Sequence, residues 1–272
     1  MVGPNGSGKT TLVRVASRAL RPRSGRVVVA GTDPYAIPAR RAARMVAVVP
    51  QDLAPAFSFT ALEVAMMGRA PHRSGWGSAQ PEDWVRVRSA MELTGVQQLA
   101  DRPIDELSGG ERRRVILAQA LPQDAPVLLL DEPTTHLDIR HVIELVATVR
   151  RLASDEDRAV LAVFHDLNLA AATCDRLVAL SAGRVVAMGA PEDVVTRELL
   201  RSVYDVELEV YPSAMTGRPV VIPGPPPPAR PRLRHRAHVV GARVEAPGSC
   251  ASWPSAATKS RPPSCTPPTR TL

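Results

Sequence analysis

Aromatic residues, cysteines and long apolar runs are all scarce in this sequence. Phe, Trp and Tyr make up 3% of the 272 residues, and the three cysteines show no disulfide or zinc-ligand spacing. No apolar run approaches the roughly 20 residues of a membrane-spanning helix. We therefore expect no membrane span, and so few cysteines fit a reducing compartment such as the cytoplasm. The hydrophobic content of 44% is enough for the core of one large domain or two small ones.

Acidic residues are nearly absent from the last fifty positions. Residues 223–272 hold eight Lys and Arg, the single acid Glu245 and 12 of the 27 prolines, so the net charge of +7 belongs to this segment. We predict a disordered Pro/Arg-rich tail, because the segment has no apolar periodicity with which to build a core. It is either a cationic linker to nucleic acid or anionic lipid, or out-of-frame readthrough of a GC-rich gene. No aromatic–basic alternation is present, which favours readthrough, and no nucleic-acid partner is expected.

The remaining chain alternates between two kinds of apolar pattern. Short valine- and leucine-rich runs predict buried strands, and longer periodic segments predict helices. This alternation indicates an α/β fold with a mainly parallel sheet. The predicted strands are Val27–Ala30, Met45–Val49, Val127–Pro133, Ala159–Asp166 and a pair around the turn at Ser181–Gly183; the predicted helices are Thr10–Leu20, His141–Leu152, Leu167–Cys174 and those within about 59–119.

A glycine-rich loop near the start carries the first chemical motif. The octapeptide GPNGSGKT matches the phosphate-loop pattern, in which backbone N–H groups at a helix N-terminus point at phosphate oxygens. The lysine of such a loop reaches the β- and γ-phosphates, and the hydroxyl after it ligates Mg²⁺. The predicted nucleotide contacts are Gly3, Pro4, Asn5, Gly6, Ser7, Gly8, Lys9, Thr10 and Thr11, with Thr10 also a metal ligand.

Two carboxylates, Asp131 and Glu132, follow the continuous apolar run VLLL. Asp131 would stand at the carboxyl end of a buried strand, where ligands bind in open α/β sheets, and there it can hold Mg²⁺. Glu132 is placed to orient and deprotonate an attacking water. A merely solvated acidic pair is the alternative, which the phosphate loop upstream argues against.

The segment LSGGE, Leu107–Glu111, predicts a capped helix start with exposed N–H groups. Together with the loop and the Asp-Glu strand, it resembles the ATP-binding-cassette ATPases, which LSGG sets apart from other phosphate-loop proteins. The resemblance implies a phosphate-loop (RecA-like) parallel sheet core, a helical subdomain over about 59–119 that carries LSGG, and an N-terminal antiparallel β part that is incomplete here. The nucleotide-binding domain would span residues 1–222.

Further landmarks of that family stand in order along the chain. Gln51 matches the Q-loop glutamine, which senses Mg²⁺ and couples to the membrane partner. Asp138 matches the D-loop, which reaches across a dimer, and His165 matches the switch histidine that contacts the γ-phosphate. The resemblance implies that ATP lies between two head-to-tail copies, bound by the loop of one and by Ser108, Gly109 and Gly110 of the other. Catalysis would fall to Glu132, His165 and Gln51, and Mg²⁺ to Thr10, Gln51 and Asp131.

The stretches MGRAPH, ADRPIDELSGGERRRVILAQAL, TTHLDIRH, HDLNLAA and GRPVVIP look like those of ATPase subunits that power ferric-siderophore, haem and cobalamin importers. This branch implies ATP and Mg²⁺ as cofactors, a homodimer, integral-membrane permease subunits, an indirect link to a substrate-binding protein, and a cytoplasmic place on the inner face of the membrane. Arg113 stands where the family often has Gln, and Gln119 where Arg is frequent. Both are expected to lie off the catalytic groups and to matter little.

Only Met1 and Val2 precede the loop. Family members carry about thirty residues more, including an aromatic residue that stacks on adenine and the central strand that feeds the loop. Losing four or five buried side chains of that strand would cost roughly 10 kcal/mol, comparable with a whole domain's stability. We expect that the beginning is missing, through a misplaced start codon or a disrupted gene, and that a chain starting at Met1 folds poorly and binds ATP weakly.

Two other interpretations stay open. Soluble cassette ATPases of DNA repair and translation share these motifs, but they usually carry paired cassettes, long coiled coils or zinc modules, none of which is visible. A non-catalytic fragment from a truncated gene would keep the motifs and lose the fold. Folded protein with ATPase activity would separate the leading interpretation from that fragment.

Overall fold

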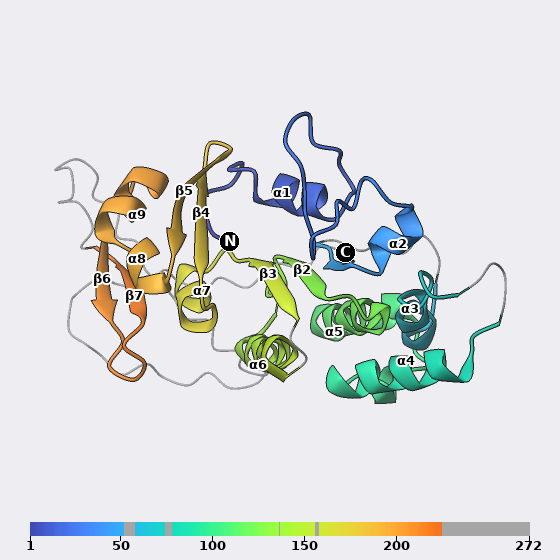
Figure 1. Cartoon of the computed structure of the whole chain (residues 1–272). Coiled ribbons are helices and arrows are strands. Elements are labelled where there is room, and N and C mark those ends of the chain that lie inside the picture. Colours follow the sequence, from blue (N-terminus) through green and yellow to red (C-terminus); the bar gives the residue numbers. More distant parts are fainter. Residues whose placement is uncertain (52–57, 74–77, 136, 156–157, 225–272) are drawn as a thin grey trace, which may run out of the picture. The chain divides into compact units, whose positions relative to one another are not determined.

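The computed structural model describes residues 1–51, 58–73, 78–135, 137–155 and 158–224 (Figure 1). The chain divides into two units, Met1–Pro226 and Pro227–Leu272, and the second lies outside the described residues. The boundary at residue 222 and the disorder of the tail therefore stay predictions. Within the described ranges, no helix has both the length and the apolar character needed to cross a bilayer.

A parallel sheet forms the centre of the described unit. Strands β1 (Val46–Val49), β2 (Val127–Asp131) and β3 (Ala159–Val163) pair in that order, all parallel. Both faces of β2 are covered, and Leu128, Leu129 and Leu130 are at most 2% exposed, as its continuous apolar run predicts. The predicted α/β fold with a parallel core is confirmed.

Met1 and Val2 lie extended between β3 and the next strand, β4 (Leu177–Ser181). Met1 donates to the Ala162 carbonyl and accepts from the Phe164 amide, while Val2 forms a parallel bridge to Ala179. Both residues are at most 4% exposed, and burial lowers the pKa of the Met1 ammonium. These two residues connect the edge of the three-stranded sheet with the antiparallel pair of β4 and β5 (Arg184–Gly189).

A cavity of about 620 Å³ adjoins Met1. Its walls come from β3, the start of β4 and the helix α6 (Ile139–Asp155), and they are largely apolar, with Leu145, Val160 and Val178 among the lining residues. The packing that is close around β2 is therefore interrupted here, next to the start of the phosphate loop.

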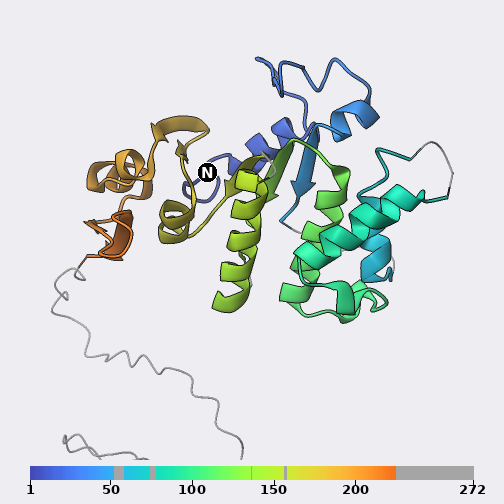
Figure 2. The same ribbon diagram turned by 60° about the horizontal axis from the view of Figure 1, so that its bottom comes forward.

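Helices surround the sheet and supply the connections between strands. Figure 2 shows α3, α4 and α5 gathered at one side, opposite the hairpin of β6 and β7. The other helices are α1 (Lys9–Ala16), α2 (Ala39–Ala43), α3 (Ala61–Met67), α4 (Pro81–Leu93), α5 (Gly109–Ala120), α7 (Leu167–Thr173), α8 (Pro191–Val194) and α9 (Arg197–Tyr204); short 3-10 helices are η1 (Gln97–Leu99), η2 (Ile104–Glu106) and η3 (Leu121–Gln123), and the last strands are β6 (Leu208–Pro212) and β7 (Pro219–Pro223).

Two local predictions were wrong. The run Val27–Ala30 is not a strand: Val29 forms an isolated bridge with Thr32 around a turn at Ala30–Gly31, where both residues have positive φ. Val28 is 53% exposed, so this run has no sheet face to bury. The first helix ends at Ala16 rather than Leu20, because Arg18 takes a φ of 66° that a helix cannot continue.

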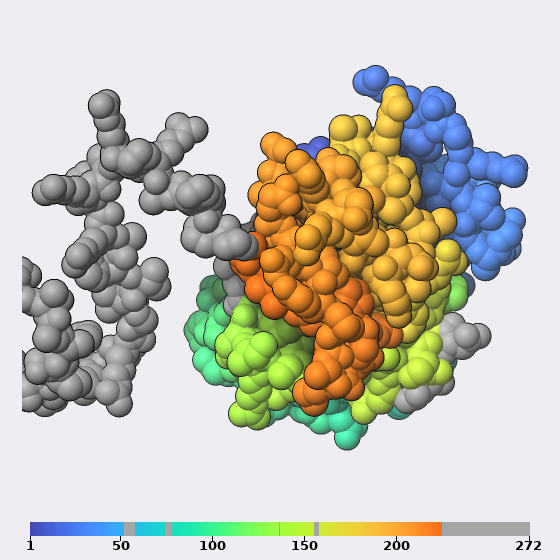
Figure 3. All heavy atoms as spheres, turned by 90° about the vertical axis from the view of Figure 1, so that its left-hand side faces the viewer, coloured from blue at the N-terminus to red at the C-terminus, as the bar shows by residue number. Residues whose placement is uncertain are grey.

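The C-terminal part adds a hairpin that sequence patterns did not predict. Figure 3 looks onto the face made mainly by residues from β4 onward, coloured yellow to orange. The strands β6 and β7 pair antiparallel, and the Asn168 side chain of α7 bonds both backbone groups of Val221. The Arg218 guanidinium donates to the carbonyls of Ala171 and Cys174 at 2.9 and 2.7 Å. The hairpin is thereby fixed to α7.

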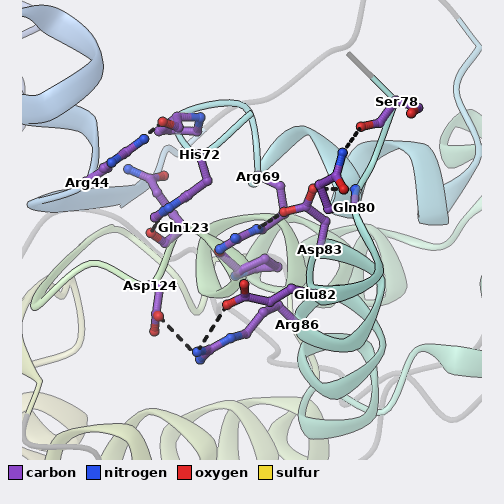
Figure 4. A network of polar contacts seen from close by, with 12 residues as sticks. Arg44, Arg69, His72, Ser78, Gln80, Glu82, Asp83, Arg86, Gln123 and Asp124 are labelled. Atoms are coloured by element: carbon purple, nitrogen blue, oxygen red, sulfur yellow. Dashed lines mark hydrogen bonds and ion pairs between the residues drawn. The ribbon is translucent and has the colours of Figure 1, made fainter. Parts of the chain in front are cut away.

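The helices α3 to α5 form the predicted helical part and have their own core, which includes Val64, Val87 and Val115. A polar network joins this part to the sheet (Figure 4). The Arg69 guanidinium bonds the Asp83 carboxylate at 2.7 Å and the Pro122 carbonyl at 2.8 Å. The Gln123 side chain donates to the Val46 carbonyl of β1 at 2.8 Å.

The ion pair of Arg69 and Asp83 is buried, with side chains 6% and 5% exposed. Burial alone would raise the pKa of Asp83, but hydrogen bonds from Arg69 and the Gln80 amide hold it below its ordinary value. The pair is fully bonded where α3 ends and α4 begins. Breaking one partner of such a pair leaves the other charge buried without compensation.

We predict that Asp83→Asn lowers the free energy of unfolding by about 3 kcal/mol, as a buried charge left without its partner does. Urea unfolding followed by circular dichroism measures this free energy. The double variant Arg69→Met/Asp83→Leu should lose less unfolding free energy than Asp83→Asn, because it leaves no unpaired buried charge. Glu144→Gln breaks the exposed pair with Arg140 and serves as the control. If Asp83→Asn unfolds at the wild-type midpoint, as the control should, the buried pair does not stabilise the junction.

Candidate nucleotide-binding site

The glycine-rich loop lies against the end of β4. A Cβ at Gly3 would stand 2.2 Å from the Leu180 carbonyl oxygen, so only glycine allows this approach. Gly6 and Gly8 have φ of 76° and 100°, in the region that favours glycine. Gly8 is the residue before α1. The loop therefore leads directly into the first turn of a helix, whose backbone N–H groups have no partner within the helix.

Lys9 folds back over the loop. Its ammonium donates to the carbonyls of Gly3 and Pro4 at 2.8 and 2.9 Å, and the residue is 6% exposed. Burial lowers the pKa of Lys9, and the nearby Glu132 and Asp131 carboxylates oppose that shift. A partly desolvated ammonium beside the N-terminus of a helix is suited to a polyphosphate.

The Ser7 hydroxyl supports the same fit. Its oxygen is buried and has no hydrogen-bond partner among the described residues. Ser7 is 2% exposed and lies within the loop, between Gly6 and Gly8. A buried hydroxyl without a partner is costly, and a ligand oxygen at the loop would supply the missing bond. The loop residues present therefore fit a bound phosphate group.

The structure brings together two of the three predicted metal ligands, Thr10 and Asp131. The Thr10 hydroxyl, in the first turn of α1, lies 3.5 Å from a carboxylate oxygen of Asp131 at the end of β2. Burial raises the pKa of Asp131, while the Thr10 hydrogen bond opposes this. A hydroxyl and a carboxylate side by side are the oxygen donors that Mg²⁺ prefers, so this pair fits the ion.

Glu132 lies at the centre of the polar contacts beside this pair. Its carboxylate accepts from the Gln51 amide nitrogen at 2.8 Å and lies 2.5 Å from His165 Nε2. Glu132 is 8% exposed, whereas the His165 side chain is 46% exposed, so one end of the cluster is buried and the other faces solvent. Gln51 follows β1, Glu132 follows β2 and His165 follows β3.

The predicted signature residues lie at another place, the start of α5. Ser108 caps this helix reciprocally with Glu111, and Ser108 and Gly109 are exposed. Gly110 faces His141 and Leu137, next to the start of α6. Asp138 accepts from the His141 amide at 2.9 Å, and this bond, with the His141 side chain, lowers the pKa of Asp138. The signature and the predicted D-loop residue are thus close in one chain.

Sequence reasoning missed Arg113. It was expected to lie off the catalytic groups, and that expectation is wrong. Its side chain reaches the backbone of both Gln51 and Glu132 and is buried. A signal was present: Arg113 shares a helix face with Ile116, Leu117 and Ala120, all buried, at spacings of three, four and seven residues.

This geometry is that of a phosphate-loop nucleotide-binding domain, and comparison with known proteins specifies the family. The ABC transporter family profile matches residues 1–135. The cobalamin import ATP-binding protein BtuD of Halobacterium salinarum is 48% identical over 225 residues, which are 83% of this chain and 56% of that protein. The iron(3+)-hydroxamate import ATP-binding protein FhuC of Bacillus subtilis is 37% identical over 222 residues, 82% of each chain. The chain belongs to the family of ABC transporter ATP-binding proteins.

Solved structures agree with this assignment. The ATP-binding cassette MJ0796, in a dimeric post-hydrolysis state bound to ADP and Pi, matches with a TM-score of 0.62 and 25% identity. The match covers 70% of this chain and 83% of that one. The chain spans a little over half the length of the halobacterial relative, at 56%.

We predict that Lys9→Ala weakens nucleotide binding by about tenfold or more, because hydrogen bonds to a charged group contribute about 1.5–3 kcal/mol. Titration with a fluorescent ATP analogue measures the Kd. Arg23→Ala, which removes an exposed cation, should leave the Kd unchanged. Equal affinity of Lys9→Ala and wild type would contradict the role of Lys9 in the loop.

Proposed function

We propose that this chain binds ATP with Mg²⁺ and hydrolyses the γ-phosphate, as the ATP-driven subunit of a metal-chelate importer. The single observation that carries the proposal is the placement of Glu132. It stands directly after Asp131, one of the residues proposed to hold Mg²⁺, and it contacts both Gln51 and His165. A buried carboxylate held by two polar side chains at the end of a strand is suited to act on a water molecule.

Binding would begin at the loop. The backbone N–H groups at the start of α1 and the Ser7 hydroxyl point donors at the phosphates, and Lys9 exchanges the Gly3 and Pro4 carbonyls for phosphate oxygens. Thr10, Asp131 and Gln51 would hold Mg²⁺, which when bound neutralises phosphate charge. The remaining loop residues, Asn5, Gly6 and Thr11, contribute backbone groups on the exposed side.

Catalysis would use the chain's own cluster. Glu132 orients and deprotonates the attacking water, because its carboxylate is held by Gln51 on one side. His165, half-exposed at the other side of Glu132, would contact the γ-phosphate. A positioned base and a nearby donor supply both proton transfer and charge stabilisation.

Completion of the site requires a second copy of the chain. Ser108 and Gly109 are exposed at a capped helix start and Gly110 follows them, which suits contact with the nucleotide of a partner. Asp138, beside Gly110 through His141, would lie at the same dimer contact. The dimeric state of the MJ0796 cassette bound to ADP and Pi supports this arrangement.

The transport role is inferred from the relatives. Those described above are named for import of cobalamin and of iron(3+)-hydroxamate, so the cargo proposed here is a metal chelate such as a ferric siderophore, haem or cobalamin. The chain would dock as a dimer on integral-membrane permease subunits at the cytoplasmic face and respond to a substrate-binding protein indirectly. The Pro/Arg-rich residues 223–272 have no part in this proposal.

We predict that Glu132→Gln lowers the rate of ATP hydrolysis by about 10²–10⁴-fold while ATP still binds, because a general base contributes that factor. Release of inorganic phosphate from the 272-residue chain with Mg²⁺ and ATP measures the rate. Glu198→Gln, in the exposed first turn of α9, is the matched control. Turnover of Glu132→Gln near the wild-type rate would remove Glu132 from this role, and a wild type without any turnover would overturn the proposed function.

A further inference from the structure

We infer that Arg113 is a positioning residue of the proposed ATPase site, and that its guanidinium sets Gln51 and Glu132 at the distance catalysis needs. The inference rests on the proposed function and deepens it. Arg113 belongs to α5, the helix that begins at the signature, and not to any of the three strands that carry the site.

One guanidinium joins two segments that are far apart in the sequence. Arg113 is 7% exposed, and all three of its nitrogens donate to backbone carbonyls. Nη1 bonds Pro50 and Gln51 at 2.5 and 2.9 Å, Nη2 bonds Asp131 and Glu132 at 2.7 and 2.9 Å, and Nε bonds Pro133 at 3.3 Å. The contacts therefore divide between the loop after β1 and the loop after β2.

The second of these loops is strained. Glu132 has a φ of 50°, a left-handed conformation that costs a non-glycine residue about 1–3 kcal/mol unless its surroundings impose it. Arg113 accounts for that constraint, since it binds the carbonyls of Asp131, Glu132 and Pro133 in succession. Turning these three carbonyls toward one cation directs the Glu132 side chain the other way, toward Gln51 and His165.

The contacts form a closed triangle. Arg113 holds the Gln51 backbone, the Gln51 side chain donates to the Glu132 carboxylate at 2.8 Å, and Arg113 holds the Glu132 backbone. Two of the three sides therefore depend on the guanidinium. Without it, the Gln51–Glu132 bond alone would have to align two loops.

Arginine is suited to this place in a way that other residues are not. A planar guanidinium presents five N–H donors in a fixed fork, whereas lysine has a single point charge with three donors and glutamine has two donors on one nitrogen. Neither replacement has enough donors for the five carbonyls that Arg113 contacts in this chain. The five carbonyls that Arg113 contacts lie at the ends of β1 and β2 and not in the phosphate loop, so we expect nucleotide affinity to change little.

The test compares Arg113→Gln and Arg113→Lys with the control Arg114→Gln, because the Arg114 guanidinium bonds the Gly95 carbonyl of the helical part at 3.3 Å. We expect kcat to fall about tenfold or more in both Arg113 variants, since small misplacements of catalytic groups cost up to about 10²-fold. The KM for ATP and the number of titratable nucleotide sites per chain should stay within about threefold of wild type. Arg114→Gln should keep the wild-type kcat.

A double variant separates positioning from simple damage to the fold. If Arg113 acts through Gln51, Gln51→Ala/Arg113→Gln should be little slower than Gln51→Ala alone, because the two changes remove one alignment. Three outcomes would each overturn the inference. They are losses of rate that add fully in the double variant, a wild-type kcat in Arg113→Gln, and a fall in kcat equal to the fall in titratable nucleotide sites. If Arg113→Gln is insoluble, Arg113→Lys is judged by the same criteria. If the wild type hydrolyses ATP and the Arg113 variants do so at the same rate, this inference is wrong but the proposed function is not contradicted.

Discussion

The parallel register of three strands is the constraint on which the candidate site depends. Val49, Leu130 and Ala162 lie side by side across β1, β2 and β3. Parallel strands all end at the same edge, so the residues that follow them meet there. Gln51 and Glu132 each come two residues after this level and His165 three, which is why side chains more than eighty positions apart in sequence form one cluster.

Register places the three loops but does not fix their detailed course. Groups outside the sheet determine that course. The glycines allow the turn that leads into α1, and the Arg113 guanidinium binds the backbone carbonyls around Glu132. We infer that this buried cation serves the geometry of the strained turn more than its stability, because burying a charge costs free energy. The site thus combines a regular scaffold with one irregular turn held from the side.

The sequence was informative where a motif is local and silent where it depends on tertiary packing. The course of the phosphate loop follows from its glycines, and the burial of β2 follows from its continuous leucines, so both could be predicted. The run Val27–Ala30 has the composition of a strand, but among the residues that the structure describes its one pairing is the bridge from Val29 to Thr32. The function of Arg113 depends on which carbonyls surround its guanidinium, and no spacing along the chain specifies those. The roles of the site residues themselves remain predictions that activity measurements decide.

The attachment of the β6–β7 hairpin has a consequence for how the molecule fluctuates. The Val221 amide donates to the Asn168 side chain at 2.6 Å, rather than to another strand. Asn168 belongs to α7, whose first turn is capped by Asp166, the residue after His165. Fraying of this first turn therefore frees the Val221 amide proton for exchange with solvent at the moment His165 loses its support. The exchange rate of the Val221 amide therefore reports the order of the helix that follows His165.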